Sequence, residues 1–322
     1  MNHDPQWDGR RVVVTGAAGF IGSRVAAGLA AAGADVVGVD CFDPYYAEAQ
    51  KRANVARIRG RFRLLETDLA EVDLEPLLDG VSCVFHLSAQ AGVRGSWASG
   101  FDHYVRANIQ VTQRLLETVR GSSLERFVYS SSSSVYGDVS GPVDEDAPTR
   151  PRSPYGVTKL SAEHLCGVYA REFDVPTVSL RYFTVFGPGQ RPDMAIHRMI
   201  ESALHDRPFP LYGDGSARRD FTFVADVVSA NLLAAVADVE PGTVLNVGGG
   251  STRSVSSVLD DVAEAVGRPV PIDRQARQPG DVAMTAAICD RAGDLLGWAP
   301  RVPWREALAR QVAWHREGLG RV

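Results

Sequence analysis

Valine-rich apolar runs alternate with amphipathic stretches through the first half of the chain. The apolar runs have the length and β-branched content of buried strands and occupy residues 11–14, 35–39, 62–65, 83–87, 126–129 and 175–183. Helical patterns lie between several of them, at about 20–32, 101–119 and 154–173. Buried strands separated by helices predict an α/β fold with a doubly wound parallel sheet, covered by helices on both faces.

This regular alternation ends near residue 184, where Pro, Arg and Phe become more frequent and the expected elements are shorter. A helix at about 226–237 and a strand at 243–247 are predicted to return to the first lobe. We expect residues 1–183, with about 225–248, to form the first domain. A smaller α/β C-terminal lobe is expected from about 184–224 together with 249–322.

Composition and charge limit the classes of function. The chain has 322 residues, of which 45% are hydrophobic and 23% charged, the balance of an ordinary globular protein. A formal net charge of -5 and a pI near 5.8 provide no basic footprint, so nucleic acid is not an expected partner. Local positive groups must therefore meet any anionic ligand.

The cysteines and the N-terminal segment indicate a cellular compartment. Cys41, Cys83, Cys166 and Cys289 lie far apart and form no CxxC pair. The first ten residues lack the apolar core of a signal peptide, and no stretch reads as a membrane span. We therefore expect reduced thiols, no membrane association and a cytoplasmic location.

Three glycines lie directly between the first predicted strand and the first predicted helix. Gly16 permits a tight turn, Gly19 lets the backbone approach a pyrophosphate, and Gly22 lets the helix pack on the sheet. A lone glycine triplet also fits an ordinary turn, but the strand-loop-helix context favours a Rossmann-type dinucleotide site. Phe20 and Ile21, at the helix start, are expected to line it.

The second predicted strand ends in Asp40. A carboxylate there accepts hydrogen bonds from the adenosine ribose and repels a 2′-phosphate, which favours NAD over NADP. A helix cap or turn acid is the alternative interpretation of Asp40. Asp68 and Leu69 follow the third strand and are expected to line the adenine.

A second motif lies where a helix is predicted to begin, with Ser153 as its N-cap and Pro154 in the first turn. Tyr155 and Lys159 are four residues apart and so share one helical face. A free phenol titrates near ~10, but a nearby ammonium and a nicotinamide cation favour the phenolate and lower its pKa. Tyr155 is therefore predicted to act as the base.

The glycine loop and the Tyr155–Lys159 pair together resemble the extended short-chain dehydrogenase/reductase family. The resemblance implies that Ser132 shares the substrate hydroxyl proton and that Lys159 holds the nicotinamide ribose. It also implies further cofactor-binding residues: Leu87, Ala89, Gln90, Asn108, Ser130 and Tyr182. The seven histidines make no metal-ligand pattern in the sequence, so no metal is predicted.

The residues after Ser132 distinguish reactions within this family. Relatives that eliminate water carry Asp-Glu there, and relatives that decarboxylate usually carry Glu before Val-Tyr-Gly, whereas this chain has Ser133 and Ser134. Elimination then lacks a second proton carrier. Epimerisation at C4 of a nucleotide sugar needs none.

The run from Arg181 to Ala195 resembles UDP-glucuronate 4-epimerases, as do Asp43-Pro44-Tyr45-Tyr46 and the segment ending in Arg94. The resemblance implies that Arg191 meets the uronate carboxylate and that Thr184, Ser133 and Ser134 lie around the sugar. A guanidinium suits this task because it is always charged and binds carboxylate through two donors. A solvated surface arginine is the alternative.

Family segments that line the nucleotide pocket are matched by Tyr212, Arg219, Gln278 and Asp281, with Arg219 expected at a phosphate. Galactose epimerases have arginine at the position of Gln278, which leaves the second phosphate contact open between Arg218 and Arg274. Turn capping is the alternative for Asp281.

The sequence thus favours an NAD-dependent UDP-glucuronate 4-epimerase. UDP-glucose/UDP-galactose 4-epimerase comes second and UDP-glucuronate decarboxylase third. A non-catalytic NAD-binding sensor is the alternative from another class. The resemblance also implies a homodimer that pairs through the helices near 101–119 and 154–173.

Overall fold

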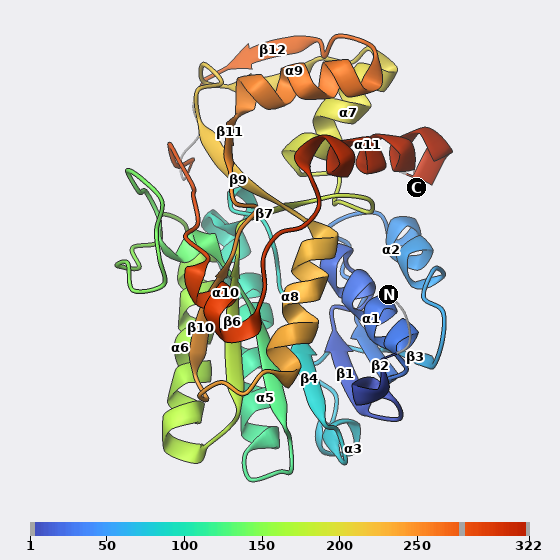
Figure 1. The fold of residues 1–322 in the computed structure, drawn as a ribbon, viewed down its shortest axis with the longest axis vertical. Helices are drawn as coiled ribbons and strands as arrows, with labels where there is room; N and C mark the ends of the chain where they lie inside the picture. The colour runs from blue at the N-terminus through green and yellow to red at the C-terminus, as the bar shows by residue number, and fades with distance from the viewer. Residues whose placement is uncertain (1–3, 277–280, 320–322) are drawn as a thin grey trace.

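The computed structural model describes residues 4–276 and 281–319, and a seven-stranded parallel sheet forms its centre (Figure 1). The strand order is β10-β6-β5-β4-β1-β2-β3, so the expected doubly wound α/β sheet is confirmed. Its strands are β1 (Arg11–Thr15), β2 (Asp35–Asp40), β3 (Phe62–Glu66), β4 (Cys83–His86), β5 (Arg126–Ser132), β6 (Thr177–Tyr182) and β10 (Thr243–Val247).

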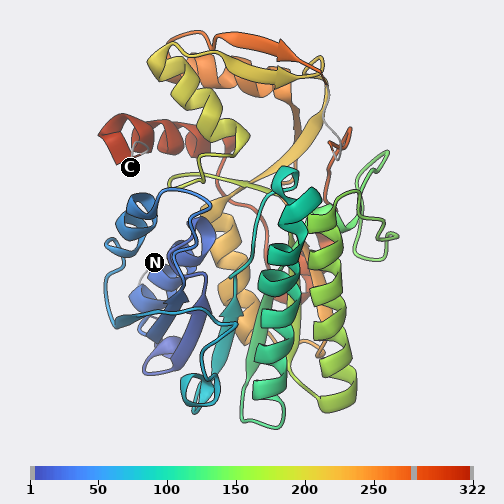
Figure 2. The same ribbon diagram turned by 180° about the vertical axis from the view of Figure 1, so that it is seen from behind.

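Alternating side chains of the strands fill two separate cores. Val12 and Val14 of β1 pack with Leu29 of α1 and with α8, whereas Val13 packs toward Leu115 of α5 and toward α6. Figure 2 shows the second layer from behind. The helices of this lobe are α1 (Phe20–Ala32), α2 (Glu48–Val55), α3 (Glu75–Leu78), α4 (Phe101–Tyr104), α5 (Val111–Val119), α6 (Pro154–Phe173) and α8 (Val224–Val236).

Short turns of helix connect these elements. The helix expected at about 101–119 is present but is built from α4, a π-helical segment and α5. The short segments are η1 (Pro5–Trp7), η2 (Arg94–Ser96), η3 (Ala98–Gly100), η4 (Val105–Gln110) and η5 (Ser133–Val135).

A smaller α/β layer lies above the carboxyl ends of the sheet strands (Figure 1). It contains a three-stranded sheet in the order β11-β9-β7 and a two-stranded sheet of β12 and β8. Its elements are β7 (Thr184–Phe186), α7 (Ala195–His205), β8 (Phe209–Tyr212), β9 (Arg218–Phe223), β11 (Thr252–Ser254), α9 (Val255–Val266), β12 (Ile272–Gln275), α11 (Trp304–Trp314) and η6 (His315–Leu319).

Two later segments return to the first lobe. The strand expected at 243–247 is β10, which pairs in parallel with β6, and α8 packs against α1. A further helix, α10 (Asp290–Leu296), contacts β10 and α8, although its residues fall in the expected second domain. Among the described residues, no helix is both long and apolar enough to cross a lipid bilayer.

A buried ion pair fixes α6 to the sheet. Arg181 of β6 and Glu163 of α6 are 2.7 Å apart at Nη2 and Oε1, and their side chains are only 6% and 4% exposed. Tyr136 accepts another guanidinium hydrogen bond, and the Ser131 hydroxyl donates to Glu163. This network anchors the helix that carries Tyr155 and Lys159.

Replacement of Arg181 with methionine leaves the Glu163 carboxylate buried without its cation. We expect the free energy of unfolding to fall by about 3–5 kcal/mol. The double variant Arg181→Met/Glu163→Met should recover most of this loss, because no uncompensated charge then remains. Urea denaturation of both variants measures the difference, and equal losses would refute this role of the pair.

Candidate active site

The glycine loop joins β1 to α1 with the geometry that close backbone approach requires. Gly16 has φ +67°, and a Cβ there would lie 2.8 Å from the backbone nitrogen of Ser88. A Cβ on Gly22 would overlap the carbonyl oxygen of Gly16. Both positions therefore exclude side chains. The backbone N–H groups in the first turn of α1 therefore face an open cleft.

Asp40 lies at the end of β2 beside this loop. Its carboxylate accepts hydrogen bonds from the backbone N–H groups of Ala18 at 2.9 Å and Phe42 at 2.8 Å. The carboxylate thus acts as a turn acid, the alternative raised from the sequence. A carboxylate has about four lone-pair sites, so it can also accept ribose hydroxyls.

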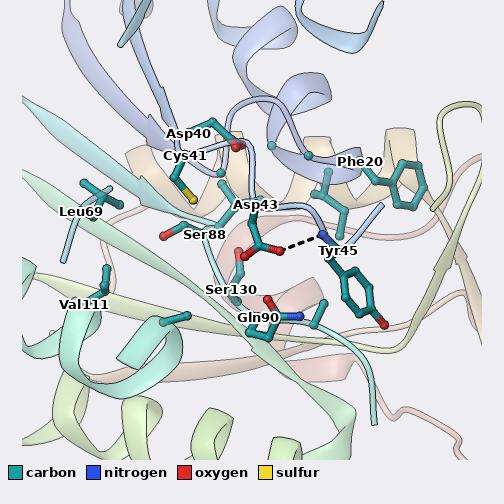
Figure 3. A pocket seen from close by; sticks show the side chains of 18 of the residues that line it. Phe20, Asp40, Cys41, Asp43, Tyr45, Leu69, Ser88, Gln90, Val111 and Ser130 are labelled. Carbon is teal, nitrogen blue, oxygen red and sulfur yellow. Dashed lines mark hydrogen bonds between the residues drawn. The ribbon is translucent and has the colours of Figure 1, made fainter. Parts of the chain in front are cut away.

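A cleft of about 290 Å³ runs along the carboxyl ends of these strands (Figure 3). Its walls include apolar faces suited to an adenine ring and polar groups suited to riboses. Of the predicted cofactor-binding residues, those lining it are Gly16, Gly19, Phe20, Ile21, Gly22, Asp40, Asp68, Leu69, Leu87, Ala89, Gln90, Ser130, Tyr155, Lys159 and Tyr182. This combination of an anion-binding turn and a ribose acceptor fits a dinucleotide such as NAD.

Asn108 is the predicted cofactor residue that does not line the cleft. It is buried, its side-chain oxygen accepts from the backbone N–H of Gln90 at 2.7 Å, and its amide donates to Thr158. The residue therefore ties the Gln90 backbone to the helix that carries Tyr155. The sequence position of Asn108 does not reveal that the residue lies behind the residues that line the cleft.

Of the predicted catalytic residues, Tyr155 and Lys159 line the cleft, and Ser132 follows the lining residue Ser131 at the end of β5. Ser153 caps α6 by accepting from the backbone N–H of Gly156 at 3.1 Å, which starts the helix just before Tyr155. The side chain of Ser132, at the end of β5, is hydrogen-bonded to Tyr155. One turn along α6, Lys159 is buried, and its ammonium nitrogen lies 4.4 Å from the centre of the Tyr129 ring.

The electrostatics of this group differ from the sequence-based expectation. Burial raises the pKa of Tyr155, and the hydrogen bond from Ser132 and the positive charge of Arg191 oppose that shift. Burial lowers the pKa of Lys159 to about 7, so its charge is easily lost. Arg191 is thus the protein cation that acts on the phenol. The nicotinamide cation has to supply the rest of the shift toward phenolate.

The low pKa of Lys159 makes stability depend on pH. Between pH 7 and ~10 the unfolded chain holds the lysine proton that the folded chain has released, so the free energy of unfolding rises with pH. We expect the stability of the cofactor-free protein, measured against Lys159→Met, to increase from pH 6.5 to 8.5. Urea titrations at each pH test this, and a constant difference would contradict the shift.

Arg191 lies on the loop between β7 and α7 and lines the same cleft. Its Nε and Nη2 atoms donate to the two oxygens of Asp193 at 2.9 and 3.0 Å, and the Tyr45 hydroxyl donates to Asp193 at 3.3 Å. Its side chain is only 22% exposed, which argues against the solvated-surface alternative. No hydrogen bond of Nη1 is found among the described residues, so the end of the guanidinium can still bind a carboxylate.

Sequence reasoning did not single out Asp193 or Tyr45. The only signal was proximity to Arg191 and the Asp43-Pro44-Tyr45-Tyr46 run, which gave no indication that both segments meet at one guanidinium. Tyr45 also lines the neighbouring cleft, so it joins the two parts of the site.

That neighbouring cleft, of about 510 Å³, lies between the Rossmann lobe and the smaller layer. Of the predicted substrate-binding residues, it brings together Arg94, Thr184, Tyr212, Arg219 and Asp281. The Arg94 guanidinium lies 4.1 Å from the centre of the Tyr212 ring and 3.4 Å from an Asp281 oxygen, so it bridges the cleft.

The remaining predicted substrate contacts divide into three groups. Ser133 and Ser134 lie in η5, directly after Ser132, whose hydroxyl accepts from the Ser134 backbone at 3.1 Å. Gln278 falls outside the described residues. Neither Arg218 nor Arg274, the two candidates for the second phosphate contact, lines the cleft, and Arg218 is hydrogen-bonded to Thr252. Arg198 of α7 lines the cleft, although it was not predicted from the sequence.

Comparison with known proteins agrees with this geometry. Residues 12–248 match the model of the NAD dependent epimerase/dehydratase family. The crystal structure of UDP-glucuronic acid 4-epimerase from Bacillus cereus, in complex with UDP-glucuronic acid and NAD, superposes with a TM-score of 0.92 at 40% identity, covering 95% of this chain and 99% of that one.

Two curated relatives are similar along nearly their whole length. A UDP-glucuronate 4-epimerase from Thermodesulfobacterium geofontis is 34% identical, covering 95% of this chain and 96% of the relative. An uncharacterized UDP-glucose epimerase from Bacillus subtilis is 39% identical, covering 94% and 97%. Sequence, fold and site geometry agree, and the chain belongs to the NAD dependent epimerase/dehydratase family.

Proposed function

We propose that this protein is a UDP-glucuronate 4-epimerase that interconverts UDP-glucuronate and UDP-galacturonate through a transient 4-keto sugar. The observation that carries the proposal is Arg191, a largely buried guanidinium with one edge open beside Tyr155. A fixed cation next to the reacting carbon suits a sugar with a carboxylate on C5. Similarity to the Bacillus cereus enzyme, which binds UDP-glucuronic acid and NAD, supports the same assignment.

Tyr155 and Ser132 move the proton of the 4-hydroxyl. Their mutual hydrogen bond lets Ser132 hold the sugar oxygen while the phenolate of Tyr155 takes the proton and later returns it. Bound NAD, held by the residues that line the first cleft, would supply the hydride chemistry at C4 on both faces of the 4-keto sugar. Lys159, one helical turn away, positions the nicotinamide ribose.

Arg191 protects the intermediate from losing carbon dioxide. A 4-keto uronate is a β-keto acid, and it decarboxylates most readily when its carboxylate is desolvated and turned out of the carbonyl plane. Asp193 binds the Nε edge of the guanidinium and so fixes its orientation. The opposite edge, formed by Nη1 and Nη2, can then donate two hydrogen bonds to the substrate carboxylate. Thr184, Ser133 and Ser134 offer further hydroxyls to the sugar and its carboxylate.

The uridine diphosphate is proposed to bind in the cleft that Arg94 and Tyr212 bridge. Arg219 is assigned to the diphosphate, and Arg198 replaces Arg218 and Arg274 as the candidate for the second contact. Asp281 lines the same cleft and is assigned to the nucleotide.

UDP-glucose/UDP-galactose 4-epimerase is the second candidate. Asp193 already neutralises Arg191, so a neutral hexose meets no unpaired charge at C5. The Bacillus subtilis relative is described as a UDP-glucose epimerase.

Product analysis separates these activities. The purified protein is incubated with UDP-glucuronate or UDP-glucose, with and without added NAD, and the products are resolved by chromatography with mass detection. We expect UDP-galacturonate of unchanged mass, without a need for added NAD. Conversion of UDP-glucose alone would favour the second candidate, loss of carbon dioxide would indicate a decarboxylase, and no reaction would favour the sensor.

We also propose a cytoplasmic homodimer and the two domains expected from the sequence, with α10 reassigned to the first. Val157, Val168 and Phe173 are more than a third exposed on α6, in the helix pair proposed to form the dimer interface. The four cysteines are free, in keeping with a reducing compartment. Light scattering of the purified protein tests the dimer, and a monomeric mass would contradict it.

A further inference from the structure

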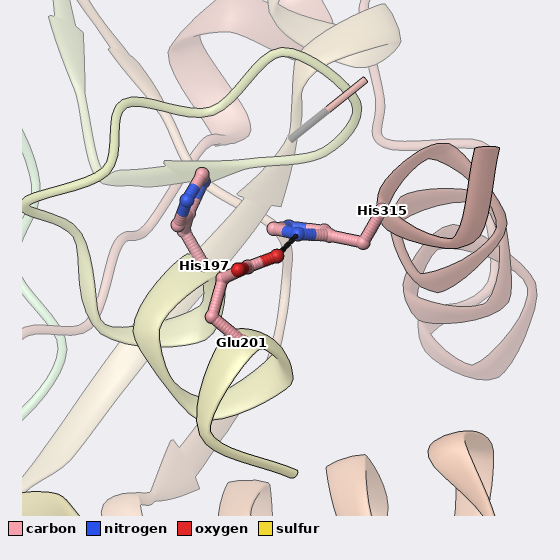
Figure 4. A group of neighbouring side chains, drawn as sticks. All are labelled: His197, Glu201 and His315. Carbon is pink, nitrogen blue, oxygen red and sulfur yellow. Dashed lines mark hydrogen bonds and ion pairs between the residues drawn. The ribbon is translucent and has the colours of Figure 1, made fainter. Parts of the chain in front are cut away.

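A cluster of metal-binding side chains lies away from both clefts, where α7 meets the C-terminal segment. It consists of His197 and Glu201, one turn apart on α7, and His315, which begins η6 (Figure 4). One ligand atom from each residue lies within 4.8 Å of those of the other two. We call this group the His-Glu-His cluster.

We propose that the His-Glu-His cluster binds one zinc ion, or a similar borderline transition-metal ion, through a nitrogen of each imidazole and an oxygen of Glu201. Two imidazoles with one carboxylate suit such ions, whereas calcium and magnesium prefer oxygen ligands alone. Water fills the remaining position. The sequence had predicted no metal, because His315 lies more than one hundred positions from His197 and Glu201.

The His197 ring is already arranged as a ligand. Its Nδ1–H donates to the backbone carbonyl of Gln190 at 2.9 Å, which fixes the tautomer and leaves the lone pair on Nε2. Metal-ligating histidines typically make this outer hydrogen bond.

His315 provides the second observation. Its side chain is fully buried, and its Nδ1 donates to Glu201 at 2.7 Å. Its Nε2 is buried without a hydrogen-bond partner among the described residues, which is costly for a polar atom. The centre of the His315 ring lies 4.5 Å from that of the His197 ring. A metal ion is a partner that suits these nitrogens without adding a proton.

Glu201 is held as a ligating carboxylate usually is. One oxygen faces His315, and the other lies 3.3 Å from Nε2 of His205, one turn further along α7. The ion then links the C-terminal segment to α7, the helix that follows the Arg191 loop.

Metal titration of the full chain, with no histidine tag and after treatment with chelator, tests this site. We expect one Zn²⁺ per chain by calorimetry, and a melting temperature that rises with free Zn²⁺. His197→Gln and His315→Gln each remove a ligand, so each should weaken binding by more than the about 10- to 100-fold that loss of an outer-shell partner costs. His164→Gln is the matched control, because His164 is exposed on α6, and it should change nothing.

Glu201→Gln keeps the shape of the side chain and a hydrogen-bond acceptor for His315, so it tests the charge of the site if a histidine variant fails to fold. Circular dichroism confirms the fold of every variant. Absence of saturable Zn²⁺ binding would overturn the proposal. So would binding that is equally tight in wild type, Glu201→Gln and the histidine variants.

Discussion

Replacement of Tyr155 with phenylalanine should lower kcat on the order of 1,000-fold while leaving the fold and NAD binding intact. The phenol is the cleft-lining group proposed to exchange the 4-hydroxyl proton, and its ring packs edge-on against Tyr104, a contact that phenylalanine preserves. Positioned acid-base groups contribute about 100- to 10,000-fold. Steady-state conversion of UDP-glucuronate measures the loss.

Tyr169→Phe is the matched control, because it removes a phenol from the same helix whose hydroxyl binds Glu117 rather than the cleft. Its kcat should stay close to that of wild type, because Tyr169 lines neither cleft. Residual activity of Tyr155→Phe near that of the control would show that another group transfers the proton.

Replacement of Arg191 with alanine should have the second large effect, on both affinity and product. We expect kcat/KM for UDP-glucuronate to fall on the order of 100-fold, since a charged bidentate contact is lost from a largely buried position. The 4-keto uronate is then less well held in plane. Part of the product should therefore be a UDP-pentose, lighter by the mass of carbon dioxide.

Arg207→Ala serves as the control, since Arg207 is exposed just beyond α7 and lines neither cleft. UDP-glucose turnover by Arg191→Ala should fall much less than uronate turnover. Unchanged uronate affinity, with no pentose released, would refute the role of Arg191 as the carboxylate clamp.

The sheet and the cofactor loop could be predicted because their signals are local. Valine-rich runs and the spacing of Gly16, Gly19 and Gly22 lie within a few residues of one another, and the structure reproduces both. The pairing of Tyr155 with Lys159 could be predicted likewise, because residues four apart on a helix share one face. Such patterns are dictated by backbone geometry and need no tertiary information.

Contacts between distant segments could not be predicted in this way. Tyr45 and Asp193 are almost 150 positions apart in the sequence, yet they are hydrogen-bonded beside Arg191. Asn108 lies behind Gln90 and binds its backbone, a contact that depends on how the helical segment carrying Asn108 packs on the sheet. The low pKa of Lys159 comes from burial, which its spacing to Tyr155 does not reveal. These features depend on how the layers pack.

The most direct test of the account uses UDP-glucuronate that carries deuterium at C4, converted in ordinary water by protein without added NAD. Tyr155 is proposed to exchange only the hydroxyl proton, and bound NAD would supply the hydride chemistry that keeps the C4 hydrogen on its carbon. The account therefore predicts UDP-galacturonate that retains deuterium at C4 in full. Loss of the label to water, or a product lighter by carbon dioxide, would contradict it.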